Sequence, residues 1–207
     1  MLFAVLIVLV LLCLSEIWWR KTKIHGEVSR KFVHVTVGSF VAFWPFFLSW
    51  HEIELLSLVF LICVAISKYL NIFKAIHSVQ RPTWGELYFA IAVGSVAFIT
   101  HNQWIYMTAL LQMSLADGLA AIVGTHYGKK QKYLVFGQVK SVIGSLMFLI
   151  ISLALLITYM QVSGAQINLF SMVILAIGAT IIENLGILGL DNLFVPLLIA
   201  VALNAIH

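Results

Sequence analysis

Asp117 is an acidic residue inside a long apolar stretch, "LQMSLADGLAAIVGTHYGKK", which runs from Leu111 to Lys130. A carboxylate at the centre of a membrane helix costs roughly 2.5–3.5 kcal/mol on insertion scales. Ionisable residues at such depth usually face an interior cavity and mark a functional path. A carboxylate there can coordinate a divalent cation or accept the proton of a hydroxyl. We therefore predict that Asp117 is a catalytic or metal-binding residue.

Glycines and lysines follow Asp117 in a pattern that favours phosphate binding. Small residues let helix backbones, or a ligand, approach closely. Lys140 and Ser141 precede the next apolar run, where unpaired backbone N–H groups and the helix dipole favour an anion. The P-loop pattern G-x-x-x-x-G-K-[ST] is absent, and lysines in such a connection also commonly serve only as topology signals. The nucleotide-binding residues predicted in this region are Gly124, Gly128, Lys129, Lys140 and Ser141, and Lys140 is also predicted to be catalytic.

A second basic group stands at the entrance of the second apolar run, in "EVSRKFVHV". Arg30 and His34 are four positions apart and share a helix face. We predict that Arg30 and Lys31 contact a nucleotide and that His34 is catalytic. The alternatives are a headgroup anchor for the Arg30–Lys31 pair and a structural role for His34.

Three further acidic residues, Glu86, Glu183 and Asp191, begin or end apolar runs at the same predicted depth as Asp117. Each could be a hydrated helix-end residue at the interface. Their clustering instead predicts that Glu86 is a catalytic candidate and that Asn192 hydrogen-bonds the nucleotide or substrate. A carboxylate beside phosphates suggests Mg²⁺, which binds one or two carboxylates and keeps phosphate and water ligands. The candidate metal ligands are Asp117, Glu183 and Asp191.

The elements that must position these residues are membrane helices. The 207-residue chain is 62% hydrophobic and 10% charged, with a mean hydropathy of +1.07, so its solvent must be lipid. Runs of this length satisfy their own backbone groups as helices. We predict an all-α, polytopic integral membrane bundle of seven to eight transmembrane helices, forming a single transmembrane catalytic domain over 1–207. The apolar runs occupy 2–19, 33–50, 53–70, 86–101, 104–125, 141–160 and 167–187, with a shorter run at 192–206.

All twelve basic residues fall in three connections, around 20–31, 68–85 and 126–140. These connections lie two crossings apart, so they share one side of the membrane. The positive-inside rule makes that side, and the site with it, cytoplasmic and places the N-terminus outside. The net charge of +4 thus reflects orientation rather than nucleic-acid binding. Cys13 and Cys63 lie in apolar runs and are expected to be free thiols.

Five segments together carry a resemblance to a known family: "RKFVHV" (30–35), "RPTWGELYF" (81–89), "ADGLAAIVGTHYG" (116–128), "VKSVIGS" (139–145) and "ENLGILGLDNLFVPL" (183–197). In that order, they resemble the CTP-dependent lipid-alcohol kinases, which include dolichol, phytol and farnesol kinases, and more distantly phosphatidate cytidylyltransferase. The resemblance implies transfer of the γ-phosphate of CTP to a membrane lipid alcohol such as dolichol, another polyprenol or phytol. It also implies that 126–141 takes part in CTP binding. Ile143 departs from the family, which commonly has Glu at this position.

Other classes of protein use similar residues. A cytidylyltransferase making a CDP-lipid would release pyrophosphate rather than CDP. A CDP-alcohol phosphatidyltransferase would need an Arg where Ile122 stands, together with later aspartates that are missing here. A small ion or solute transporter would need polar residues through both membrane halves, and the outer half is almost purely apolar. The expected partners are CTP, the lipid alcohol and membrane lipids; the oligomeric state stays open, with a dimer as one option.

Overall fold

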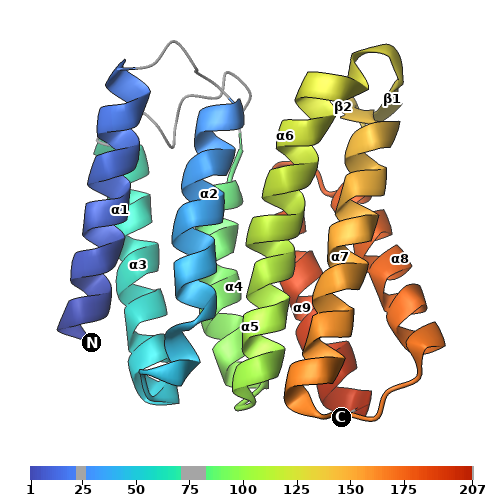
Figure 1. The fold of residues 1–207 in the computed structure, drawn as a ribbon. Helices are drawn as coiled ribbons and strands as arrows, with labels where there is room; N and C mark the ends of the chain where they lie inside the picture. The colour runs from blue at the N-terminus through green and yellow to red at the C-terminus, as the bar shows by residue number, and fades with distance from the viewer. Residues whose placement is uncertain (22–26, 71–82, 207) are drawn as a thin grey trace.

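The computed structural model describes residues 1–21, 27–70 and 83–206, which form a bundle of long helices capped by one short hairpin (Figure 1). The central span is divided into α5, the π-helical segment η2 and α6, and a short 3-10 turn, η3, follows it. The elements are α1 (Leu2–Lys21), α2 (Glu27–Ala42), η1 (Trp44–Phe46), α3 (Trp50–Leu70), α4 (Gly85–Ile99), α5 (Gln103–Leu111), η2 (Gln112–Ala116), α6 (Asp117–Tyr127), η3 (Gly128–Lys130), β1 (Lys132–Val135), β2 (Gln138–Ser141), α7 (Val142–Ser163), α8 (Leu169–Leu185) and α9 (Asp191–Ile206).

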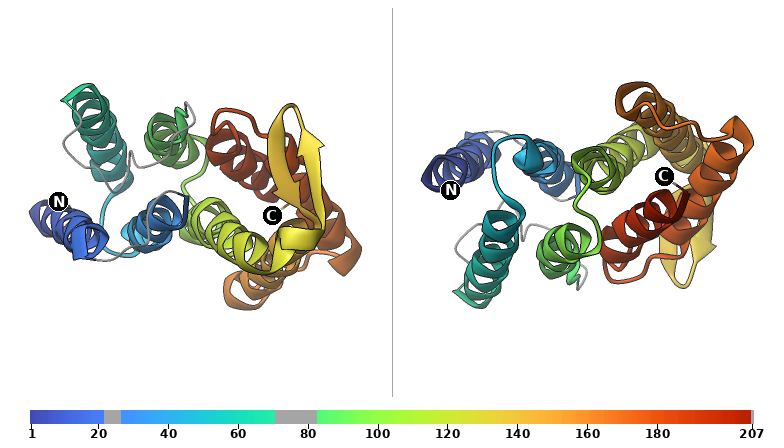
Figure 2. Two further views of the ribbon diagram at one scale, coloured as in Figure 1. Left: turned by 90° about the horizontal axis from the view of Figure 1, so that it is seen from above. Right: turned by 90° about the horizontal axis from the view of Figure 1, so that it is seen from below.

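The helices stand in two rows when the bundle is viewed along its axis (Figure 2). One row holds α1, α2 and the central span, the other holds α3, α4 and α9, and α7 and α8 close one end. The central span is the most buried of the long apolar segments. Its Ile105, Tyr106 and Leu110 are fully buried, as are Phe148 of α7 and Ile199 of α9. The core therefore surrounds the helix that carries Asp117.

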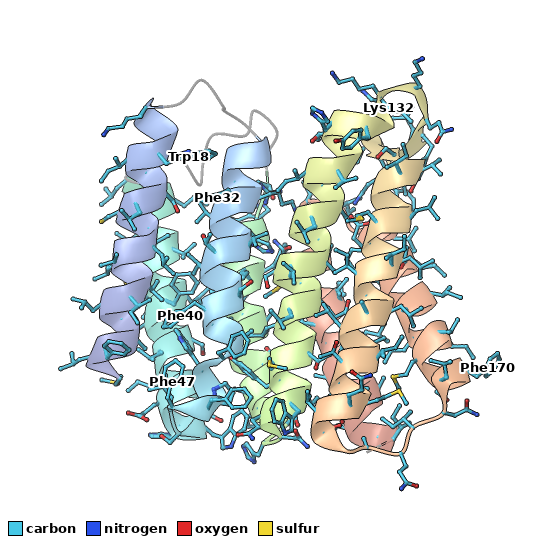
Figure 3. All side chains as sticks on the ribbon, in the orientation of Figure 1. Trp18, Phe32, Phe40, Phe47, Lys132 and Phe170 are labelled. Carbon is cyan, nitrogen blue, oxygen red and sulfur yellow. The ribbon has the colours of Figure 1, made fainter. Side chains whose placement is uncertain are left out.

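The helices are apolar on the outside as well as in the core, which confirms the predicted membrane bundle. Three segments are long and apolar enough to cross a bilayer: Trp50–Leu70, Gln103–Lys130 and Val142–Ser163. Shorter apolar helices occupy Leu2–Trp18, Gly85–Ile99, Leu169–Leu185 and Asp191–Ile206. Large side chains such as Phe170 point away from the bundle and are exposed (Figure 3). An exposed apolar surface of this extent requires lipid as its solvent.

Both chain ends lie at one end of the bundle, opposite the hairpin (Figure 1). The last apolar run forms α9, which is as long as α2 and has a buried face that includes Ile199 and Leu203. When α5, η2 and α6 are counted as one central span, the described residues form eight long helical segments, of which α9 is the last. This count is the upper value of the predicted seven to eight.

The predicted second span, 33–50, had the wrong boundaries. The helix begins at Glu27 and ends at Ala42, and a short turn at Trp44–Phe46 follows it. Arg30 and Lys31 are consequently buried in its first turns instead of lying in the connection before it. Apolar content alone misplaced the start, because partners on other helices make burial of these charges possible.

The connection before α7 contains a short hairpin, which the all-α membrane bundle carries at one end. β1 and β2 pair antiparallel, with Val135 opposite Gln138 and Lys132 opposite Ser141. The two residues between the strands, Phe136 and Gly137, have φ angles of 47° and 79°. Positive φ at both central positions is typical of the tight turns that join two-residue hairpins. The segment therefore holds Lys140 on a strand, with Ser141 as the N-cap of α7.

Immediately before Asp117 the central helix widens into a π-helical turn. The Asp117 N–H bonds the carbonyl of Gln112, five residues back, instead of the usual fourth. The buried Gln112 side chain donates from Nε2 to the Ser152 carbonyl of α7 at 3.0 Å. Such widened turns are rare and frequently occur at functional sites. Here the turn sets the direction in which the Asp117 side chain leaves the helix.

Gly118, next to Asp117, allows α6 to approach α2. A Cβ at this position would lie 2.1 Å from Val35 Cγ2. Gly124 and Gly144 do the same between α6 and α7, since a Cβ on Gly124 would lie 3.1 Å from Gly144 Cα. Small residues at such crossings let membrane helices pack closely. The glycines after Asp117 thus bring neighbouring helices against the carboxylate.

Gly118→Ala should lower the thermal stability of the purified protein, because its Cβ would overlap Val35. Overpacking costs about 1–3 kcal/mol, which exceeds the roughly 1 kcal/mol that alanine gains over glycine in a helix. Thermal unfolding in detergent, followed by circular dichroism, measures the effect. Adding Val35→Ala should restore most of the lost stability.

Gly178→Ala is the matched control, because its Cβ would meet only Leu198 Cδ2 at an ordinary 3.7 Å. This variant should be as stable as the parent protein or slightly more stable. A Gly118→Ala protein that unfolds at the parent temperature would contradict the close α2–α6 packing.

Candidate functional site

A cavity of about 460 Å³ opens at the hairpin end of the bundle. Its walls come from α2, α6, the hairpin, α7, the end of α8 and the start of α9. Segments far apart in the sequence thus meet around one space, as the sequence predicted. The predicted site residues that line it are Arg30, Lys31, Asp117, Gly124, Lys140, Ser141, Glu183 and Asp191.

Asp117 is buried and forms an ion pair with the buried Lys31, whose Nζ donates to Oδ2. His34, one turn further along α2, lies on the same side, with Nε2 3.8 Å from Asp117 Oδ2. His34 Nε2 is also 3.0 Å from the Met113 carbonyl in the π-helical turn. Because a carbonyl only accepts, the His34 proton sits on Nε2 in this contact. α2 therefore places an ammonium and an imidazole beside the Asp117 carboxylate: the Lys31 ammonium donates to it, whereas the imidazole N–H bonds the Met113 carbonyl.

Lys140 forms the second ion pair of the cavity. Its Nζ lies 2.6 Å from Glu183 Oε1 and 2.9 Å from the Glu183 carbonyl at the end of α8. Burial alone would lower the pKa of Lys140, but the carboxylates of Glu183 and Asp191 outweigh it, so the pKa is raised above its ordinary value. The ammonium is therefore fully protonated at neutral pH and offers a permanent positive charge to the cavity.

Ser141 begins α7 beside Lys140. Its Oγ accepts a hydrogen bond from the Gly144 N–H at 3.1 Å, which caps the helix. A Cβ on Gly124 would lie 2.7 Å from Ser141 Oγ, and one on Gly128 would lie 2.5 Å from Ser141 Cβ. Both glycines thus bring the start of α7 against α6. The Val142 N–H bonds the Gln131 carbonyl at 3.0 Å, so the first turn of α7 is largely paired, and its contribution to the cavity is the positive end of the helix dipole, which favours an anion.

Glu86 and Asn192 lie in a separate small pocket, not in the main cavity. Glu86 Oε2 lies 3.7 Å from Lys68 Nζ, and Lys68 also sits 4.3 Å from the centre of the Trp84 ring. The buried Asn192 donates from Nδ2 to the Gly85 carbonyl at 3.0 Å. Arg30 lines both spaces and therefore connects this pocket to the cavity.

Lys129 stands apart from the other predicted residues: it is exposed on η3 and is not among the cavity-lining residues. Gly128 is buried behind Ser141 and likewise does not line the cavity. Their predicted roles in nucleotide binding stay predictions. Lys132 and Gln138, which were not among the predicted site residues, also line the cavity from the two strands of the hairpin. The Phe136–Gly137 turn between two alternating strands was the signal that could have revealed them.

The carboxylates of the cavity fit a magnesium ion that arrives with a phosphate ligand. Asp117, Glu183 and Asp191 all line the space. Within residues 1–21, 27–70 and 83–206, no three His, Cys, Asp or Glu side chains converge into a ready metal site. Mg²⁺ does not require such a set, because it uses one or two carboxylates together with phosphate oxygens and water.

These features define a class: a multi-pass membrane protein with a buried, charged cavity suited to a polar, phosphate-bearing ligand. Comparison with known proteins gives the family. The chain is 31% identical over 195 residues to the phytol kinase of Synechocystis sp. (strain ATCC 27184 / PCC 6803 / Kazusa), covering 88% of this chain and 81% of that protein. It is 31% identical over 198 residues to the probable phytol kinase 1, chloroplastic, of Oryza sativa subsp. japonica, covering 84% of this chain and 62% of that protein.

The chain belongs to the phytol kinase family. Its class of activity is that of a membrane lipid-alcohol kinase, a transferase. No family model matches the chain, and no solved structure matches it. The resemblance drawn from the five sequence segments is confirmed at the level of this family.

Lys31→Met should destabilise the protein by about 3 kcal/mol, because it leaves the Asp117 carboxylate buried without its cation. Thermal unfolding in detergent tests this. Lys130→Met is the matched control, since Lys130 is exposed on η3 and its removal should change stability little. Equal stability of both variants would show that the Lys31–Asp117 pair has no structural importance.

Proposed function

We propose that this protein transfers the γ-phosphate of CTP to phytol or a closely similar isoprenoid alcohol, with Mg²⁺ accompanying the nucleotide. The family and the phytol kinases named above support the acceptor class. The observation that carries the proposal is the cavity itself. A buried carboxylate, Asp117, faces it together with Lys31, Lys140 and the start of α7.

The cavity has the charges that a triphosphate needs. Lys31 and Lys140 are each paired with a carboxylate in this structure. Phosphate oxygens can take over part of that pairing, while Arg30 adds a further positive charge in the wall. Phosphoryl transfer depends mainly on positioning and charge neutralisation. The cluster of cations from α2, β2 and the α7 N-terminus supplies both.

In the proposed reaction the oxygen of the lipid hydroxyl attacks the γ-phosphorus. The new bond joins that oxygen to phosphorus, and the bond between the γ-phosphorus and the β–γ bridging oxygen breaks, so CDP leaves. Asp117 accepts the hydroxyl proton or contacts the nucleotide-bound cation. His34 lies beside the carboxylate, with Nε2 3.8 Å from Oδ2. A bound Mg²⁺ would neutralise charge on the phosphates, with Glu183 and Asp191 as further contacts.

The proposed orientation places the cavity on the cytoplasmic side. The end of α1, the start of α2, the end of α3, η3 and the hairpin carry the basic residues among those described, and they lie at the end of the bundle opposite both termini (Figure 1). An excess of Lys and Arg on one side of a membrane protein is typical of its cytoplasmic face. CTP is a soluble, charged molecule, so this orientation lets it enter from the aqueous side while the alcohol comes from the bilayer.

Asp117→Asn should reduce phosphorylation of phytol by at least about a hundredfold, because proton transfer or metal contact at this position is lost. The assay follows label from γ-labelled CTP into lipid in the presence of Mg²⁺, using purified protein. Membrane insertion should be retained. Because the variant also leaves the buried Lys31 without its carboxylate, thermal unfolding is measured in parallel, and turnover is compared at a temperature where both proteins remain folded. Near-normal turnover in this variant would remove Asp117 from the reaction.

The same assay separates the proposed kinase from a cytidylyltransferase. A kinase releases CDP and labels the lipid from the γ-position, whereas a cytidylyltransferase releases pyrophosphate. Absence of label in every lipid alcohol of a panel would reject the kinase proposal.

Lys140→Met should raise the KM for CTP roughly tenfold or more, because a buried, charge-assisted contact to phosphate is lost. The KM for the lipid alcohol should change little. Lys129→Met is the matched control: it removes an exposed lysine from the same connection and should leave the KM for CTP close to that of the parent protein. A larger effect at Lys129 than at Lys140 would place the nucleotide outside the cavity.

A further inference from the structure

A second hollow lies in the other half of the bundle, outside the charged cavity. It is an apolar groove of about 130 Å³ between α1 and α3. Its lining includes Val5 and Leu9 of α1, and Val59 and Cys63 of α3. Along α3 it extends from Leu56 to Ser67, which is about 16 Å at roughly 1.5 Å of rise per residue.

The groove adjoins the small pocket that is lined by Glu86 and Asn192. Leu12, Phe60 and Val64 line both spaces. The small pocket in turn shares Arg30 with the charged cavity. The three spaces therefore lie next to one another in a row, which is apolar at one end and charged at the other.

Polar groups gather where the apolar groove ends. His34 and Glu86 line the small pocket beside Arg30. Asn192 Oδ1 is buried and has no hydrogen-bond partner in the described part of the chain, and the buried Glu86 Oε2 faces the Lys68 ammonium at 3.7 Å, beyond hydrogen-bond distance. Buried acceptors without partners are costly, so they favour a ligand that brings a donor. A hydroxyl is such a donor, and Asp117 lies directly beyond His34.

The groove is open sideways towards the lipid. α1 packs on α2 and α3 packs on α4, whereas α1 and α3 share little contact (Figure 2). Leu9, Val59 and Cys63 are exposed at this opening. A hydrocarbon chain could enter from the bilayer without leaving an apolar environment.

We propose that this groove binds the hydrocarbon chain of the acceptor alcohol, with its hydroxyl in the small pocket beside Arg30, His34 and Glu86. The inference rests on the proposed function and adds to it the path by which the acceptor reaches Asp117. Lipid and nucleotide then approach the reacting position from opposite sides. α2 separates the two routes and contributes residues to both.

Cys63→Trp tests the groove, because a large side chain there would occupy space needed by the tail. The KM for phytol should rise roughly tenfold, a change typical of overfilling a packed apolar site. The KM for CTP should not change, and that for a short alcohol such as geraniol should change less than that for phytol. Cys13→Trp is the matched control, since Cys13 is also an exposed thiol in an apolar helix but is not among the groove-lining residues.

Parent-like kinetics for phytol in Cys63→Trp, or equal effects in both tryptophan variants, would overturn the groove. A binding experiment that needs no turnover gives a second test. A diazirine-bearing isoprenoid alcohol should crosslink to peptides containing Leu12 or Cys63, and excess phytol should compete. Crosslinking only elsewhere would also overturn the inference. If the parent protein crosslinks at the groove but transfers no phosphate from CTP, the proposed reaction fails and the lipid site stands.

Discussion

The buried ion pair between Lys31 and Asp117 constrains the whole arrangement. Neither charge is tolerable alone in the interior of an apolar bundle, because removing an ion from water costs several kcal/mol unless a partner compensates. α2 and α6 must therefore meet at one height and one rotation. Gly118 permits that approach by leaving room for Val35, and the π-helical turn before Asp117 directs the carboxylate inward. The packing of α2 against α6 therefore also fixes the geometry of the site.

A second ion pair, between Lys140 and Glu183, constrains the other wall of the cavity in the same way. It joins the hairpin to the end of α8, while Ser141 caps α7. Lys31 and Lys140 thus each have a carboxylate partner, and in the proposed reaction a phosphate-bearing ligand would take over part of this pairing. Charges interact strongly in a medium of low dielectric constant, so rearranging these ion pairs around a bound triphosphate would change the electrostatic energy of the site considerably.

The two halves of the bundle border different kinds of space. α6 to α9 and the hairpin enclose the charged cavity, and α1, α3 and α4 border the apolar hollows. α2 lies between them and presents Lys31 to one side and Val33 to the other. A lipid-alcohol kinase must bring together a substrate from water and a substrate from lipid. The structure keeps these environments on opposite sides of one helix.

The sequence by itself determined the membrane class, the approximate spans and the likeness to lipid-alcohol kinases, because hydropathy and local motifs need no knowledge of packing. It also singled out Asp117, Lys31 and Lys140, since a charge in an apolar run requires a reason. Only the tertiary structure decided which residues pair, Lys31 with Asp117 and Lys140 with Glu183. It also decided that Glu86 lies in a separate pocket. Depth along a helix can be read from position in the chain. Rotation about its axis, which decides what a side chain meets, depends on neighbours that are distant in sequence.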